Sequence, residues 1–283
     1  MQSSTARAQL PTYTAQRYVQ PLREGGSLPA IVDTDGGLFV VKFRGAGQGP
    51  KALIAEIIAG SIAQHLGLPV PELALIEIGA AFGRAEPDPE IQEILRASHG
   101  VNVGLRYLDG AFNYDGFAAG EFIPQALAAE IVWFDAFLTN PDRTHRNPNI
   151  LIFERHPWLI DHGAALYAHH SWSGVDAERT RTPFPLIKDH VLLRAAADLN
   201  AADARLQARL DSASLARLLA GVPDALLLDP IIAGEFSDAA AARRRYHDYL
   251  LQRLAAPRAF VAEAVQARET RLHEPVQRRR ARR

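Results

Sequence analysis

The sequence predicts an α+β fold with two lobes, a β-rich front and a mainly helical back. Short apolar runs broken by glycines fill residues 17–44, a pattern typical of strands joined by turns. From Pro185 onward the apolar residues follow a helical period, as in SLARLLAGV and RRRYHDYLLQRLA. The character of the chain changes near Asp109. We therefore expect a front lobe over 1–108 and a back lobe over 109–266, with a ligand-binding cleft between them.

The composition is that of a globular chain able to fill both cores. Of its 283 residues 48% are apolar, and the formal net charge is -1. The chain has no cysteine, which excludes disulfides, thiolate zinc sites and cysteine nucleophiles. No apolar run is long enough to cross a bilayer and the N-terminus lacks a secretory signal, so we expect a cytoplasmic protein without membrane contact. Residues 267–283 end in QRRRARR and are expected to form a basic, disordered tail.

The front lobe is expected to begin with three strands and a helix. Asp35-Gly36 is a hairpin signal, and the run LFVVKF after it favours a strand, which places Lys42 inside that strand. KALIAEIIAGSIAQHL then carries an apolar residue at every fourth position, which predicts a helix ended by Gly67. That apolar stripe consists of Ile54, Ile58, Ile62 and Leu66. PELALIEIG and VNVGLRYL predict two further strands, with a peripheral surface helix, IQEILRA, between them.

The back lobe is expected to open on a buried helix, LAAEIVWFDAFLTN. The loop NPDRTHRNPN follows, too polar and too rich in proline to be helical, and then the strands NILIFE and WLIDHG. We expect the rest of the lobe to be helical over VLLRAAADL, ARLQARL, SLARLLAGV, RRRYHDYLLQRLA and AFVAEAVQARE.

The loop and the strand after it carry the residue types that phosphoryl transfer needs. Asp142 and Asn147 are spaced like the base and the metal-binding asparagine of the H-R-D-L-x-x-x-N loop, and Asp161 with Gly163 is placed like D-F-G. Asp142 would accept the proton of a substrate hydroxyl. Asn147 and Asp161 would supply oxygens to Mg²⁺. His162 would occupy the position of the D-F-G phenylalanine.

The front lobe offers the groups that would hold ATP. Lys42 can direct its ammonium group at the phosphates, and Glu56, on the following helix, is the carboxylate expected to hold it. The turn Gly25-Gly26-Ser27 would lay backbone N–H groups over the phosphates. Taken in this order along the chain, these residues predict a bilobal protein-kinase-like fold that uses ATP and Mg²⁺.

Several nearby polar residues admit a second interpretation. Arg143 could steady either a phosphate or the loop itself, and the loop is favoured. Asp135 is expected to pair locally, with a partner that the sequence does not identify, and Asn149 ranks below Asn147 as a metal ligand because it starts a strand. The histidines nearby match no metal-ligand spacing on a helical face, so we do not expect a transition metal. These histidines are His145, His162, His169 and His170.

Two long segments carry a family resemblance. FDAFLTNPDRTHRNPNILIF with WLIDHGAALYAHH, and EGGSLPAIVDTDGGLFVVKFRGAGQGPKALIAEIIAG near the front, are both similar to the HipA-like kinase family. The resemblance implies a divergent protein-kinase-like fold with Asp142 as base, Asn147 and Asp161 as metal ligands, and Lys42 at the phosphates. The parent HipA toxins are serine/threonine kinases that work beside a DNA-binding antitoxin. A DNA-binding, antitoxin-like partner is therefore expected by family analogy only.

The leading hypothesis is a kinase that phosphorylates a hydroxyl, of serine or threonine in a protein or of a small molecule. The alternatives are a nucleotide-binding regulatory module without efficient transfer, and a structural partner of a DNA-binding protein. The segment SWSGVDAERTRTPFP lies where a kinase has its activation segment, so autophosphorylation there is a further hypothesis. Its candidate acceptors are Ser171, Ser173, Thr180 and Thr182.

Overall fold

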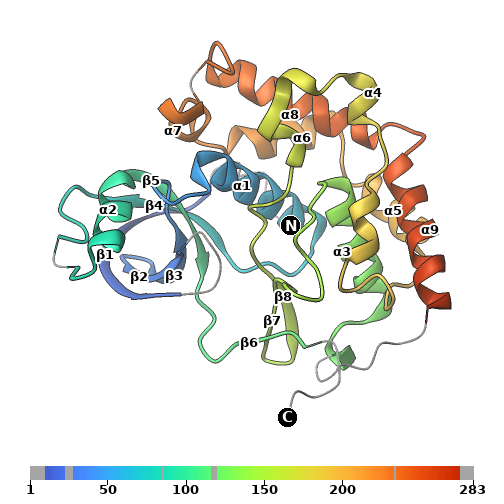
Figure 1. The fold of residues 1–283 in the computed structure, drawn as a ribbon, viewed down its shortest axis with the longest axis horizontal. Coiled ribbons are helices and arrows are strands. Elements are labelled where there is room, and N and C mark those ends of the chain that lie inside the picture. Colours follow the sequence, from blue (N-terminus) through green and yellow to red (C-terminus); the bar gives the residue numbers. More distant parts are fainter. Residues whose placement is uncertain (1–9, 23–27, 85, 116–119, 233, 275–283) are drawn as a thin grey trace, which may run out of the picture.

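The structure is a computed structural model, which describes residues 10–22, 28–84, 86–115, 120–232 and 234–274. It confirms the α+β fold, with a β-rich front lobe and a helical back lobe (Figure 1). The predicted turn at Gly25, Gly26 and Ser27 lies outside the described residues. Of the disordered tail expected over 267–283, the residues up to His273 instead belong to the helix α9 (Ala259–His273), and residues 275–283 lie outside the described residues.

The front lobe is a closed barrel of five strands in the order β1-β2-β3-β5-β4. The strands are β1 (Thr12–Pro21), β2 (Ala30–Thr34), β3 (Gly37–Lys42), β4 (Leu73–Ile78) and β5 (Gly100–Arg106). Neighbours pair antiparallel except β1 and β4, which run parallel and close the barrel. The predicted hairpin at Asp35-Gly36 joins β2 to β3, and β3 is paired on both sides, with Lys42 opposite Val103.

The helix expected at the surface of this lobe belongs partly to its core. In α2 (Pro89–Ala97), Leu95 is fully buried among barrel residues such as Phe39 and Ile76. Asp88 caps the start of the helix by accepting from the backbone N–H groups of Glu90 and Ile91. The exposed face of α2 fits the prediction, but the helix is not peripheral, because its inner side completes the barrel core.

The helix α1 (Gly49–Leu66) lies between the lobes. It packs against β4 and β5 on one side and against α6, α7 and η4 on the other. The predicted apolar stripe is present, but the helix is buried far beyond it, with Leu53, Ala55 and Ile57 at most 2% exposed. Gly67 ends the helix in the left-handed region, at φ 75°.

The back lobe is built around α3 (Gln125–Phe137), which is exposed at its first turn and fully buried from Ile131 to Phe137. The strands β6 (Phe112–Asn113), β7 (Ile150–Phe153) and β8 (His156–Leu159) form a small sheet. The remaining α-helices are α4 (Ala177–Thr180), α5 (Leu199–Gln207), α6 (Ser212–Ala220), α7 (Asp224–Leu227), α8 (Ala239–Leu254) and α9 (Ala259–His273). Short 3₁₀ helices are η1 (Gly120–Phe122), η2 (Tyr167–Gly174), η3 (Pro185–Asp189) and η4 (Pro230–Ile232).

The expected helix over VLLRAAADL is wrong for most of its length. Residues 191–195 form turns, and α5 starts at Leu199 after the N-cap Asp198. The backbone N–H of Val191 donates to the carbonyl of Arg143 at 3.0 Å. The apolar residues there are buried by this pairing with the loop after α3, so their period does not mark a helix face.

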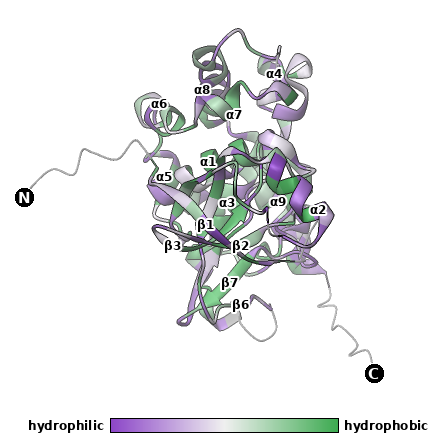
Figure 2. Ribbon diagram, turned by 90° about the vertical axis from the view of Figure 1, so that its left-hand side faces the viewer, coloured by the Kyte–Doolittle hydropathy of each residue, from purple (hydrophilic) through white to green (hydrophobic). Residues whose placement is uncertain are grey.

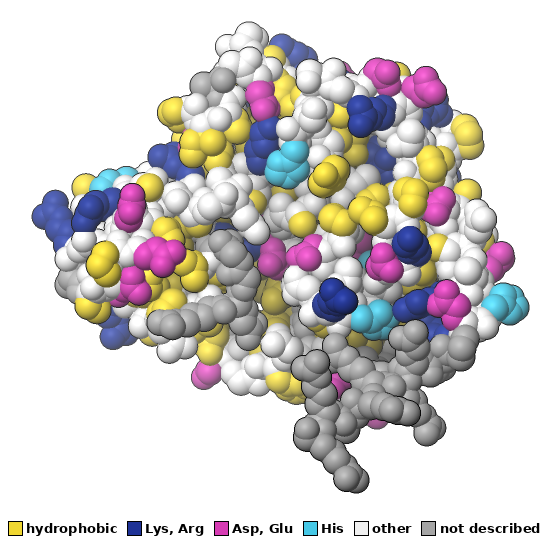
Figure 3. All heavy atoms as spheres, viewed as in Figure 1, with side chains coloured by type: hydrophobic (Ala, Val, Ile, Leu, Met, Phe, Trp, Pro, Cys, Tyr) yellow, Lys and Arg dark blue, Asp and Glu magenta, His cyan; other side chains and the backbone are white. Residues whose placement is uncertain are grey.

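The hydrophobic residues concentrate at the centre of the molecule, around α1 and α3 (Figure 2). On the face shown in Figure 3, acidic and basic side chains are interspersed with one another. Among the described residues, we find no helix that combines the length and the apolar character needed to cross a membrane.

A buried arginine, Arg253 of α8, joins three parts of the back lobe. It is 4% exposed and donates to the carbonyls of Ala136 at 2.9 Å and Phe137 at 2.7 Å, which end α3. It also donates to the carbonyl of Thr180 at 2.9 Å, which lies at the end of α4. Arg253 thus donates to carbonyls at the ends of two helices, of which that of Ala136 also accepts from the backbone N–H of Thr139 at 3.4 Å.

We expect Arg253→Met to lower the free energy of unfolding by about 3 kcal/mol, because it removes these charge-assisted hydrogen bonds from buried carbonyls. Arg205→Met is the matched control, since the Arg205 side chain is 50% exposed and pairs with Glu130 at the surface. Arg205→Met should lower the free energy of unfolding by less than about 1 kcal/mol. Urea unfolding measures both, and equal losses in the two variants would contradict the role given to Arg253.

Candidate active site

A buried ion pair lies where the barrel meets α1. The Nζ of Lys42, on β3, lies 2.6 Å from Oε2 of Glu56 on α1 and 2.5 Å from Oδ1 of Asp161. Lys42 is 8% exposed and Glu56 is fully buried, whereas the Asp161 side chain is 39% exposed. The structure thus brings together three residues that the sequence predicted to act on one nucleotide, from positions far apart in the chain.

The charges of this group stabilise one another. Burial acts to raise the pKa of Glu56, but the charge of Lys42 and the interactions with His162 together outweigh it and bring this pKa to about 2. Burial acts to lower the pKa of Lys42, but Glu56 and Asp161 raise it above its usual value. Lys42 and Glu56 are therefore both ionised at neutral pH.

His162 ties Glu56 to the segment that carries Asp161. Its backbone N–H donates to Oε2 of Glu56 at 2.8 Å, and its ring Nδ1 lies 3.3 Å from Oε1. The ring also packs edge-on against Phe134. His162 therefore packs where the D-F-G phenylalanine was expected and also bonds to the carboxylate. We call Lys42, Glu56, Asp161 and His162 the Glu56 cluster.

The backbone at Asp161 and Gly163 allows this close approach. Asp161 has φ 54°, in the left-handed region that aspartate tolerates better than most residues. A Cβ at Gly163 would lie 3.4 Å from Nζ of Lys42 and 3.5 Å from Cβ of Ala52. A side chain at position 163 would extend further into this contact, so glycine suits the position.

The loop after α3 gathers polar side chains around Asp142. Its Oδ2 accepts from the amide of Asn147 at 2.7 Å and from that of Asn149 at 3.1 Å. The backbone N–H of Thr144 donates to the carbonyls of Asp142 and Asn147, both at 2.9 Å, which closes the loop into a compact turn. The N–H of Ile160 donates to the carbonyl of Asn149, so β7 and β8 bring the loop beside the residue that precedes Asp161.

A second buried group lies beneath this loop. Asp135 of α3 is fully buried and receives Nε of Arg143 at 2.6 Å, the amide of Asn140 at 2.8 Å and Nε2 of His190 at 2.9 Å. Arg143 is 1% exposed and also donates to the carbonyl of Asn149. The favoured interpretation of Arg143 is thereby supported, because the residue contacts the loop. We call Asp135, Asn140, Arg143 and His190 the Asp135 cluster.

The sequence did not single out His190. It lies beyond η3, far along the chain from Asp135, and no local pattern marks it. The one available signal was that Asp135, an acidic residue in the apolar run IVWFDAFL of a buried helix, needed a buried donor.

The segment after Asp161 is held in place by its backbone. Lys51 of α1 donates to the carbonyl of His169 at 2.7 Å, and Arg245 of α8 donates to that of Val175. Of the four candidate phosphate acceptors, Thr180 is 2% exposed and its hydroxyl bonds to the carbonyl of Asp176. The other three candidates are more accessible, with Ser171, Ser173 and Thr182 exposed.

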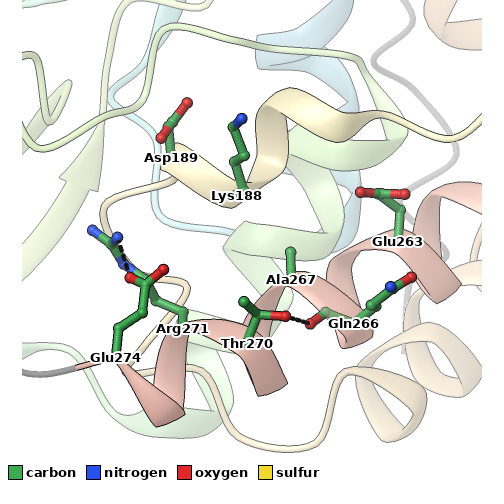
Figure 4. Close-up of a pocket in the computed structure, with 8 residues that line it drawn as sticks. All are labelled: Lys188, Asp189, Glu263, Gln266, Ala267, Thr270, Arg271 and Glu274. Carbon is green, nitrogen blue, oxygen red and sulfur yellow. Dashed lines mark hydrogen bonds and ion pairs between the residues drawn. The ribbon is translucent and has the colours of Figure 1, made fainter.

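A surface cavity of about 380 Å³ lies between η3 and α9 and contains none of the predicted site residues (Figure 4). Its lining is Lys188, Asp189, Glu263, Gln266, Ala267, Thr270, Arg271 and Glu274. Arg271 and Glu274 pair with each other at 2.7 Å. This cavity therefore carries no part of the candidate site.

The chain was compared with protein families and solved structures. A family model described as HipA-like kinase matches residues 18–178, more than half of the chain. The crystal structure of a Helicobacter pylori proinflammatory kinase, CtkA, is similar with a TM-score of 0.55 and 14% identity, over 93% of this chain and 100% of that one. Because the identity is 14%, this similarity shows that the two chains share a fold and carries no conclusion about function. No curated protein matches the chain.

The pKa of Glu56 predicts how stability depends on pH. Because this pKa falls from 4.5 to about 2 on folding, the carboxylate contributes stability above pH 4.5 and loses it as the pH falls toward 2. We expect Glu56→Gln to be less stable than the wild type by about 3 kcal/mol at pH 7. The difference should shrink as the pH falls below 4.5.

Urea unfolding at a series of pH values tests this, with Glu93→Gln on the exposed side of α2 as the control. Glu93→Gln should have the same free energy of unfolding as the wild type at every pH. A Glu56→Gln deficit that stays constant from pH 7 to the lowest pH at which the wild type is folded would contradict the prediction.

Proposed function

The chain belongs to the HipA-like kinase family, and from that premise we propose that it transfers the γ-phosphate of ATP, with Mg²⁺, to the hydroxyl of a serine or threonine residue in a protein. The family supports kinase-type activity; the nucleotide, the metal and the acceptor are our proposal. The observation that carries it is the contact of Lys42 with both Glu56 and Asp161. A lysine held by a helix carboxylate beside a metal-binding aspartate is the arrangement that kinases use at ATP phosphates.

The residues present fit Mg²⁺. Asp161 offers a partly exposed carboxylate and Asn147 an amide oxygen, and oxygen ligands of this kind suit a hard cation that keeps several waters. Asp161 and Asn147 would hold the ion together with phosphate oxygens. When bound, the ion would neutralise charge on the β- and γ-phosphates.

Lys42 would bind the phosphates through its ammonium group while Glu56 fixes the direction of that group. The buried position of Glu56 keeps water away from this pair, so the attraction is stronger than at a surface. Burial of the lysine stem on β3 leaves the ammonium little freedom to move.

Asp142 would accept the hydrogen bond of the acceptor hydroxyl and take its proton late in transfer. The amides of Asn147 and Asn149 both donate to Oδ2 of Asp142, which orients its carboxylate.

We expect Asp142→Asn to lower phosphate transfer by about 10² to 10⁴-fold, because the amide cannot take the proton. Binding of ATP should stay within about threefold of the wild type, because Asp142 contacts the acceptor rather than the nucleotide. The measurement is Mg²⁺-dependent transfer of labelled γ-phosphate into native lysate and into the protein itself. Glu178→Gln, on the exposed face of α4, is the control and should retain full transfer.

The outcomes of that assay separate the candidate functions. Label in a macromolecule that disappears with Asp142→Asn supports a protein kinase. Hydrolysis or transfer seen only when small hydroxyl compounds are added points to a small-molecule acceptor. ATP binding without transfer under any condition contradicts the proposal and favours a regulatory module.

We expect Asp161→Asn to abolish the effect of Mg²⁺ on ATP affinity, because it removes the charged metal ligand. Titration of a fluorescent ATP analogue with and without Mg²⁺ measures this. The wild type should bind more tightly in the presence of the metal. An unchanged metal dependence in the variant would show that Asp161 does not hold the ion.

A further inference from the structure

His190 lies at the meeting point of two segments that the catalytic proposal needs. It follows η3, forms an isolated β-bridge with Thr144 of the loop around Asp142, and is 4% exposed. Its Nε2 lies 2.9 Å from Oδ2 of Asp135. Neither the family match nor the predicted site includes this residue, because the matched segment ends at residue 178.

The hydrogen bonds of the ring fix where its proton lies. The backbone N–H of Leu192 donates to Nδ1 of His190 at 3.1 Å, so Nδ1 acts as an acceptor and carries no proton. The single proton of the neutral ring is then on Nε2, where it is donated to Asp135. Both nitrogens are satisfied only in this one neutral form.

The charges around the ring agree with this form. The charged groups in contact with it or close to it, among the described residues, are Asp135 of α3 and Arg143 of the loop. Burial lowers the pKa of His190; the hydrogen bond that the ring donates to Asp135 and the charge of Asp135 oppose this, and the Arg143 charge adds to the lowering. The net effect lowers the pKa of His190, so the ring is neutral at pH 7.

Asp135 connects His190 to the loop around Asp142 through hydrogen bonds. Its other oxygen accepts from the amide of Asn140, whose Oδ1 in turn accepts the backbone N–H of Asp142 at 3.1 Å. Arg143, held by the same carboxylate, donates to the carbonyl of Asn149 and, at 3.4 Å, to that of Ile160. The Asp135 cluster thus bonds to the backbone of Asp142 itself and of Ile160, which precedes Asp161; its contact nearest to Asn147 is the carbonyl of Asn149, two residues along the chain.

We propose that His190, as a neutral ring with its proton on Nε2, is a positioning residue that sets the geometry of the Asp142 loop through Asp135. This role rests on the proposed function. His190 itself contacts neither ATP nor the acceptor in the arrangement described. Its contribution is to orient Asp135, which has to offer one oxygen to the ring and the other to Asn140.

The state of the ring can be measured without any activity. Nitrogen-15 NMR of the histidine rings, with the His190 signals assigned from their absence in His190→Gln, reports which nitrogen carries the proton. At pH 7 we expect a protonated Nε2 and an unprotonated Nδ1. A proton on Nδ1, alone or together with one on Nε2, would overturn the proposal.

The positioning role is tested by two variants of one site. His190→Gln keeps an N–H donor that can reach Asp135, whereas His190→Leu fills the space without a donor. We expect His190→Leu to lower kcat by about 10- to 100-fold, the size of effect that a small misplacement of catalytic groups produces. KM for ATP should change by less than about threefold, and His190→Gln should recover most of kcat.

Stability is measured alongside, because loss of a buried donor also weakens folding. All assays are run at a temperature where urea unfolding shows every variant to be folded. A His190→Leu protein that is less stable but keeps its kcat, or a His190→Gln protein as inactive as His190→Leu, would overturn the positioning role. A wild type that transfers no phosphate would instead overturn the proposed function, and the catalytic role of His190 with it.

Discussion

The carboxylate of Glu56 is the point at which three parts of the chain are fixed to one another. It bonds to Lys42 of β3, and it bonds twice to His162, next to Asp161. A fully buried carboxylate is unfavourable unless it is paired and its oxygens accept hydrogen bonds, and both conditions hold here. Since α1 is packed by both lobes, the position of this one group fixes the barrel relative to the helical lobe.

The two buried acidic residues, Glu56 and Asp135, each position one part of the candidate site. The Glu56 cluster places the ammonium group and one metal ligand, and the Asp135 cluster places the loop with the proposed base. Each cluster reaches the backbone next to Asp161, one through the N–H of His162 and the other through the carbonyl of Ile160. The reacting groups in the loop and after β8 therefore contact neighbours that are themselves hydrogen-bonded.

Local patterns in the sequence predicted the two lobes, the lysine strand, the first helix and the spacing around Asp142, because turn residues, periodicity and motif spacing are local properties. They could not predict that β1 closes the barrel against β4, since parallel pairing depends on segments distant in the chain. Turns replace the helix expected after His190 because the backbone of Val191 pairs with the loop. Asp135 pairs locally with Asn140 and Arg143, as expected, but its distant partner His190 is set by tertiary packing.

Closure of the barrel depends on residues that lie outside the segment matched by the family model. The parallel ladder with β4 uses Thr12, Tyr13 and Thr14, which precede the segment matched by the family model at residues 18–178. Every proposed reacting group lies inside that segment. A fragment trimmed to it would keep these groups but would lose His190 and the helices α5 to α9, and it would leave β4 as a free edge, open to pairing with another molecule. Recombinant expression of the minimal family segment would for these reasons favour aggregation over a working enzyme.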